Sequence, residues 1–188
     1  MAHERASATT AGIKAHDVAR DLLAVLGFSV ALVIARHVIH TPIGVPGHSA
    51  VFWIPVLLLA GRYRMPGCAV ACATCGSLFG MGMGDLDAMK IAGVLAASAT
   101  VDAFGLGQRK RVNALLLLAA GALAHVAKLM TKILATVVAG APLNAVGVPL
   151  LPSLGLYVSF GLIGGVIALA VLYAWTRLSR ARGSGDAA

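Results

Sequence analysis

Residues 113–138 form an apolar stretch that contains one histidine and two lysines at helical spacing. His125, Lys128 and Lys132 are three and four residues apart, which places them on one face of an α-helix. A charge near the centre of a bilayer costs about 2.5–3.5 kcal/mol, so it normally faces a cavity or a partner. We therefore predict that His125 and Lys128 bind a ligand that carries carboxylate, phosphate or carbonyl groups. Alternatively, Lys132 reaches the surface with its long stem and His125 bonds to a neighbouring backbone group.

The segment HTPIGVPGHSAVFWIP, residues 40–55, holds more rigid and polar groups than a simple connection needs. His48 follows a Pro-Gly turn that fixes its direction, and Trp53 offers a flat apolar surface. A hydrogen-bonding group beside an apolar wall is what small-molecule sites require. We therefore expect this segment to form the lid or wall of a pocket, with His48 and Trp53 in contact with the ligand. The alternative for Trp53 is anchoring at a membrane interface, where tryptophan is enriched.

Two further polar residues lie in other short connections. Asp85 is a candidate for the pocket mouth, where it would pair with a lysine; the alternative is a solvated carboxylate. Asn144 is a candidate ligand contact, although a role in a turn explains it equally well. Asp102 lies elsewhere, at the far end of its stretch, and is expected to pair with the basic residues at 109–111.

A metal site is an alternative chemistry for the sulfur-bearing residues. Cys68, Cys72 and Cys75 share one helical face, and Met81 and Met83 follow them. Soft sulfur ligands suit Cu(I), but cysteine in an apolar helix commonly packs as a small apolar residue. The two groups begin at opposite ends of one stretch and cannot form a compact site. We predict packing, with no metal ligand and no cofactor. Nor do nucleophile–base or carboxylate pairs occur at matched depth, so we predict no enzyme.

Six apolar stretches position these residues. The chain is 59% hydrophobic and only 12% charged, whereas soluble domains are about 25% charged. With about 20 apolar residues needed per crossing, we predict six spans: Leu22–Ile39, Gly47–Gly61, Pro66–Met83, Leu86–Phe104, Asn113–Val138 and Val148–Thr176. The predicted fold is an all-α integral membrane protein, with an N-terminal segment (1–21), a six-helix membrane domain (22–176) and a basic tail (177–188).

The basic residues indicate the orientation. Eleven of the fifteen lysines and arginines lie in the two terminal segments and in alternate connections. They are Arg5, Lys14, Arg20, Arg62, Arg64, Arg109, Lys110, Arg111, Arg177, Arg180 and Arg182. Because basic residues accumulate on the cytoplasmic side, we predict cytoplasmic termini in a cell inner membrane. The net charge of +8 then needs no nucleic-acid partner.

The first stretch carries small residues on one face. Gly27, Ala31 and Ala35 are each four residues apart, and such a stripe lets helix backbones approach closely in lipid. It indicates either packing within the bundle or docking of a separate membrane subunit. Six spans in under 200 residues, the Ala31-xxx-Ala35 pair and the loop IGVPGHSAVFW together resemble the substrate-binding S components of energy-coupling factor (ECF) transporters, which import vitamins and transition-metal ions. The chain lacks the Met-His start typical of nickel and cobalt members, which favours a vitamin-type member.

The resemblance implies that substrate binding and ATP hydrolysis are carried out by different subunits. An S component binds its substrate from outside, in the outer half of the bundle, and docks on a transmembrane coupling subunit driven by two cytoplasmic ATPases. It hydrolyses nothing itself. Two other functions stay open from the residues: a non-catalytic scaffold of a cell-envelope complex, and a component for uptake of Cu, Ni or Co ions.

Overall fold

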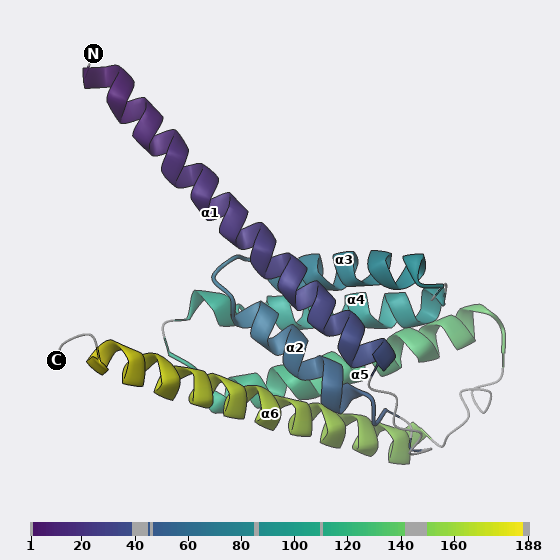
Figure 1. The fold of residues 1–188 in the computed structure, drawn as a ribbon. Helices are drawn as coiled ribbons and strands as arrows, with labels where there is room; N and C mark the ends of the chain where they lie inside the picture. The colour runs from purple at the N-terminus through teal and green to yellow at the C-terminus, as the bar shows by residue number, and fades with distance from the viewer. Residues whose placement is uncertain are drawn as a thin grey trace.

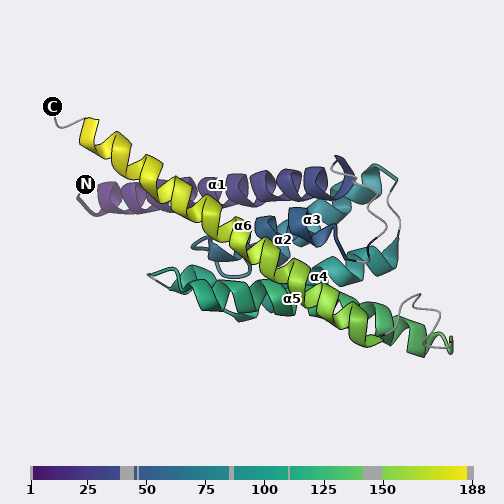
Figure 2. The ribbon, with the colours of Figure 1, turned by 90° about the horizontal axis from the view of Figure 1, so that it is seen from below.

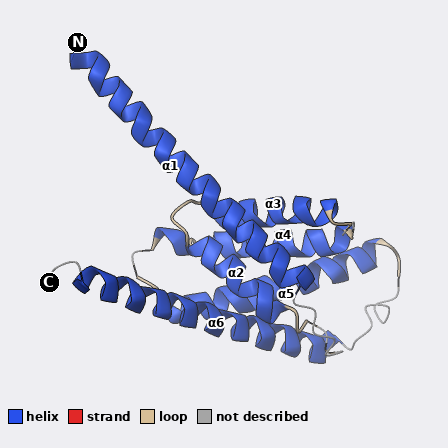
Figure 3. Cartoon of the chain, in the orientation of Figure 1, coloured by secondary structure: helices blue, strands red, loops and turns tan. Residues whose placement is uncertain are grey.

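The computed structural model describes the backbone of residues 2–38, 45, 47–84, 87–109, 111–141 and 150–185. Within these ranges all regular structure is helical (Figure 3), which confirms the predicted all-α class. The elements are α1 (Ala2–Val33), a short π-helix η1 (Ile34–Val38), α2 (Ala50–Arg62), α3 (Cys68–Gly82), α4 (Ala88–Ala103), a short 3₁₀ helix η2 (Leu106–Gln108), α5 (Ala114–Val138) and α6 (Leu150–Gly185).

Successive helices run in opposite directions, so both chain termini lie at the same end of the molecule (Figure 1). We call this the terminal end and the opposite one the distal end. The first part of α1 extends diagonally away from the other helices (Figure 1), and α6 crosses α2 and α5 obliquely (Figure 2). The last turns of α1 and α5 and the first turns of α2 and α6 lie at the distal end.

Within the described part of the chain, four helical segments are long and apolar enough to cross a membrane: His16–Arg36, Ala88–Gln108, Ala114–Val138 and Pro152–Arg180. The helices at the second and third predicted spans, α2 and α3, are apolar but have only 13 and 15 residues. At 1.5 Å per residue they measure about 20 and 22 Å, against roughly 30 Å for a hydrocarbon core. Length and composition therefore indicate a membrane-embedded protein with four membrane-length helices.

The short helix α2 forms the centre of the bundle, where it packs against α1, α3, α4, α5 and α6. Trp53, Ile54, Leu57 and Leu58 are almost completely buried. Because protein encloses α2, its length does not have to match the thickness of the lipid. The outer helices instead expose large apolar side chains, as lipid-facing helices do. Examples are Leu22, Leu23, Leu26, Val30, Leu123, Leu134, Leu162, Ile163 and Val166.

At the terminal end, polar contacts join the connection after α2 to α1. Arg64, in the connection after α2, forms ion pairs with Asp17 (3.2 Å) and Asp21 (3.1 Å) of α1. The Tyr63 hydroxyl donates to Asp21 at 3.0 Å. Partial burial and this carboxylate raise the pKa of Tyr63 above its ordinary value.

Among the described residues, Asp102 of α4 forms no ion pair with Arg109 or Arg111, two of the basic residues with which the sequence predicted it to pair. Its carboxylate accepts hydrogen bonds from the backbone N–H groups of Ala69 (3.3 Å) and Val70 (2.8 Å). These groups are unpaired donors at the start of α3, where a negative charge is favoured by the helix dipole. Asp102 therefore caps α3 from a neighbouring helix.

Candidate functional site

Three of the predicted site residues, together with one tyrosine, meet in the distal half of the bundle. We call Trp53, His125, Lys128 and Tyr157 the aromatic–lysine cluster. The Lys128 Nζ atom lies 4.7 Å from the centre of the Trp53 ring. The His125 ring meets Trp53 edge-on, with 5.6 Å between ring centres, and stacks on Tyr157 with 4.3 Å between centres. The cluster thus joins α2, α5 and α6.

Two glycines explain why His125 and Tyr157 are so close. Gly121 lies one turn before His125 on α5, and Gly161 lies one turn after Tyr157 on α6. A Cβ atom at Gly121 would stand 2.6 Å from the carbonyl oxygen of Gly161, and one at Gly161 would stand 2.5 Å from that of Gly121. The two backbones are therefore in direct contact, and this crossing holds the two rings together.

The aliphatic stem of Lys128 packs against α4. A Cβ atom at Gly93 would stand 2.8 Å from Lys128 Cγ and 3.3 Å from Thr131 Oγ1, so only glycine fits this position without displacing the lysine stem. The stem is held by α4, and the ammonium lies over Trp53, where a cation is attracted to the face of the ring. Lys128 is thus positioned between two helices, and it remains partly exposed.

The described part of the connection before α2 forms a wall of the cluster. Gly47 has a left-handed backbone (φ +84°), and its carbonyl oxygen lies 3.1 Å from His125 Nε2. A Cβ atom at Gly47 would stand 2.9 Å from that nitrogen and 3.2 Å from the Tyr157 ring. The neighbouring His48 is half-buried, and its Nδ1 atom lies 2.5 Å from the carbonyl oxygen of Val45. The Nδ1 atom of His48 is therefore occupied by a hydrogen bond within the turn.

Two polar groups of the cluster lack a usual partner within the described residues: one lacks a hydrogen bond, and the other lacks a carboxylate. His125 is fully buried, and its Nδ1 atom has no hydrogen-bond partner within the described residues. The Lys128 ammonium has no carboxylate within ion-pair distance in that same part of the chain, and the positive charges of Arg36, Lys90 and Lys132 act on it. One of these cations, Lys90, is itself paired with Asp87 at 3.6 Å.

The structure brings His125, Lys128 and Trp53 together, and His48 follows Gly47, whose carbonyl oxygen contacts His125. Asp85 and Asn144 lie outside the described residues, as do residues 40–44 and 46 of the predicted lid segment. Sequence reasoning missed Tyr157; the available signal was a phenol in an apolar stretch near the same end as His125. Binding of a ligand by His48, Trp53, Asp85, His125, Lys128 and Asn144 stays a prediction.

The small-residue stripe of α1 is partly buried. Ala35 is buried and Ala31 half-buried, whereas Gly27 is exposed, and a Cβ atom there would meet nothing within 4 Å. The adjacent face of α1 packs on α3, where the Ser29 hydroxyl donates to the carbonyl of Cys72 at 3.1 Å. The stripe therefore serves packing at its distal end and is open at its other end.

The burial of the cysteines agrees with the interpretation that they pack as small apolar residues. Cys68 and Cys72 lie in the core with no exposed surface, and Cys75 is partly buried. Among the described residues, no three or more histidine, cysteine or acidic side chains are close enough together to hold a metal ion.

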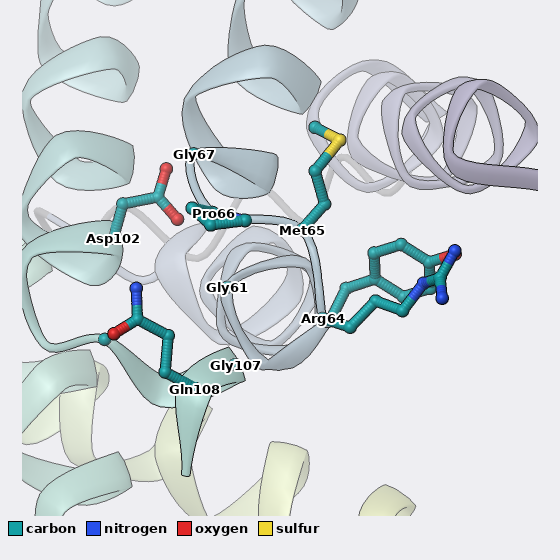
Figure 4. Close-up of a pocket in the computed structure, with 10 residues that line it drawn as sticks. Gly61, Arg64, Met65, Pro66, Gly67, Asp102, Gly107 and Gln108 are labelled. Atoms are coloured by element: carbon teal, nitrogen blue, oxygen red, sulfur yellow. The ribbon is translucent and has the colours of Figure 1, made fainter. Parts of the chain in front are cut away.

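A small cavity of about 40 Å³ opens at the terminal end, between the connection after α2 and η2 (Figure 4). Its polar lining comes from Arg64, Asp102 and Gln108. Sites for vitamin-sized ligands usually measure about 300–1,000 Å³, and the Asp102 carboxylate is already used by α3. This cavity is therefore too small for such a ligand, and one of its polar groups is already used.

No protein-family model matches the sequence, and comparisons with curated proteins and with solved structures find no similar protein. The functional argument consequently depends on the residues and their geometry.

Proposed function

We propose that the chain is the membrane-embedded substrate-capture component of an ATP-driven importer, which binds a vitamin or a related small solute from the extracytoplasmic side. The observation that carries this proposal is the aromatic–lysine cluster, which presents a buried imidazole nitrogen and an ammonium without a described carboxylate partner. Polar groups inside a membrane protein are expensive and are retained where they serve a solute or an ion.

The position of the cluster supports capture from outside. In the proposed topology all six helices cross the inner membrane and both termini are cytoplasmic, because eleven of the fifteen basic residues belong to the terminal segments and to alternate connections between the predicted spans. The cluster is built around Gly47 before α2 and Tyr157 near the start of α6, both toward the distal end. The distal end is then the extracytoplasmic one, and a solute would reach Lys128 from that side.

Energy would come from partner proteins. The six predicted spans and the Ala31-xxx-Ala35 pair in the sequence resemble those of ECF S components, so we propose docking on a transmembrane coupling subunit with two cytoplasmic ATPases. The open end of the α1 stripe at Gly27 supports α1 as the docking helix. Replacing Ala31 and Gly27 by leucine should abolish co-purification of the coupling subunit while solute binding persists. Retained co-purification would exclude this interface.

Native mass spectrometry of Lys128→Met tests the solute site. The protein, gently purified from its own membrane, should carry a stoichiometric small molecule, and the variant should lose it, because methionine keeps the stem but removes the charge. Lys132→Met is the matched control: it makes the same change one turn further along α5, at an exposed position. We expect it to retain most of the solute. Equal retention by both variants would place the site elsewhere.

A further inference from the structure

The last turns of α6 lie at the edge of the bundle and carry aromatic and basic side chains. The membrane-length segment of α6 ends at Arg180, and the helix extends past the ends of α2 and α5 (Figure 1, Figure 2). Residues 173–180 are all exposed. Because an apolar helix of a membrane protein passes from hydrocarbon into water at its ends, this segment lies at the membrane interface of the terminal end.

Two aromatic side chains mark the level of the interface on α6. Tyr173 is 59% exposed and Trp175 is 69% exposed, so neither ring is packed in the protein core. Tyrosine and tryptophan are enriched at membrane–water interfaces, because their rings are apolar and each carries one polar hydrogen-bonding group. The headgroups of the lipids are therefore expected beside residues 173–180.

The side chain of Arg177 folds back along the helix toward Tyr173. Its guanidinium carbon lies 4.9 Å from the centre of the Tyr173 ring, one turn earlier in α6. Side chains of a helix lean toward its N-terminus, which for α6 is the direction of the lipid-embedded part. Arg177 therefore places its charge at the level of the interfacial rings instead of extending it into water. Arg180, three residues later, lies on the same helical face.

No acidic side chain accompanies these two arginines. Residues 103–185 contain eight lysines and arginines and no aspartate or glutamate. In the described part of the chain, neither Arg177 nor Arg180 forms an ion pair or a hydrogen bond through its side chain. The Tyr173 ring covers one face of the Arg177 guanidinium, whereas the N–H donors of that group lie in its plane. These donors consequently need acceptors from outside the described chain.

We propose that residues 173–180 of α6 bind the phosphate of an anionic phospholipid from the surrounding membrane. The planar guanidinium of Arg177 can donate two parallel hydrogen bonds to phosphate oxygens while its face stays on the Tyr173 ring. Arg180 adds a second positive charge on the same face. The headgroup of a zwitterionic lipid brings a cation of its own, which the two arginines repel, so an anionic lipid is preferred. Such binding requires neither a solute nor a partner subunit.

Native mass spectrometry of the full chain tests the preference, with dioleoyl phosphatidylglycerol and dioleoyl phosphatidylcholine supplied in equal and limiting amounts. The two lipids have the same acyl chains, so only the headgroup differs. The unmodified protein should retain the anionic lipid at least about fivefold more often, because one basic residue near an anionic surface contributes about 1 kcal/mol. Equal retention of the two lipids would overturn the proposal. With inorganic phosphate added in excess, adducts of phosphate in place of lipid would overturn it as well.

Three variants at exposed positions separate a site on α6 from diffuse attraction by the net charge. Arg177→Gln should lower the preference by about fivefold, whereas the matched control Arg111→Gln, which removes the same charge from the connection before α5, should keep it. Tyr173→Leu changes no charge, yet it should lower the preference by about twofold or more, because the guanidinium loses the ring that holds it. Equal losses in the two arginine variants, or an unchanged preference in Tyr173→Leu, would overturn the proposal. If a variant fails to fold, the preference of the unmodified protein decides.

Discussion

Replacing Gly161 by alanine should force α5 and α6 apart at the crossing that supports the aromatic–lysine cluster. The added Cβ atom would stand 2.5 Å from the carbonyl oxygen of Gly121, 2.7 Å from Ala122 Cα and 3.0 Å from Ala122 N. All three are backbone atoms, so no change of rotamer can relieve the overlap. The helices must separate by about 1 Å to restore ordinary contacts.

The expected loss of stability in Gly161→Ala follows from comparison with Gly155, another glycine of the same helix. A Cβ atom at Gly155 would meet nothing within 4 Å, so Gly155→Ala isolates the change in helix propensity, which favours alanine by up to about 1 kcal/mol. Overpacking of a rigid contact costs about 1–3 kcal/mol, and a clash with backbone belongs at the upper end. We expect Gly161→Ala to be less stable than Gly155→Ala by about 2–3 kcal/mol.

Unfolding in mixed micelles titrated with sodium dodecyl sulfate, followed by circular dichroism, gives the free-energy difference between the variants. The Gly121→Ala/Gly161→Ala double variant should lose less than the sum of the two single losses, because both act on one contact. Solute binding should also weaken in Gly161→Ala, since the His125 and Tyr157 rings would no longer stack. Equal stability of Gly161→Ala and Gly155→Ala would refute the close crossing.

Two further predictions concern the terminal end. Asp102→Ala should lower the free energy of unfolding by about 1–2 kcal/mol, because it removes the acceptor of the Ala69 and Val70 N–H groups in the first turn of α3. Unchanged stability in the same titration would show that the cap contributes nothing. Tyr63→Phe should flatten the pH dependence of stability above pH 10. The unfolded chain releases the Tyr63 proton near its ordinary pKa of 10.0, whereas the folded chain, with a raised pKa, retains it, so the unmodified protein loses stability as the pH rises through that range. Parallel stability curves for the two proteins would exclude this linkage.

The sequence was sufficient to locate the helices but not to predict where each of them begins and ends. The predicted fifth span, Asn113–Val138, matches α5 because the Asn113 side chain caps the helix by accepting from Leu116 N at 3.2 Å. The ends of α1 and α6 were missed. Hydropathy locates the part of a helix that lies in lipid, and it contains no signal that stops a helix in water, so α1 begins at Ala2 and α6 continues to Gly185.

The sequence predicted only those features of the candidate site that lie within a single helix. The spacing of His125 and Lys128 was enough to place both on one face of α5, because helical periodicity is local. Tyr157 could not be paired with His125 in the same way, since their contact depends on the register between α5 and α6 at Gly121 and Gly161. The cap that Asp102 provides for α3 is equally a tertiary contact, and local charge pairing did not predict it.

The most direct test of the account is an experimental structure of the protein in lipid nanodiscs, prepared gently from its own membrane so that a bound solute is retained. The account predicts density for a small molecule within hydrogen-bond distance of Lys128 Nζ and His125 Nδ1, beside the Trp53 ring. A cluster in which both atoms are bonded to protein groups, with the small molecule bound elsewhere, would contradict it.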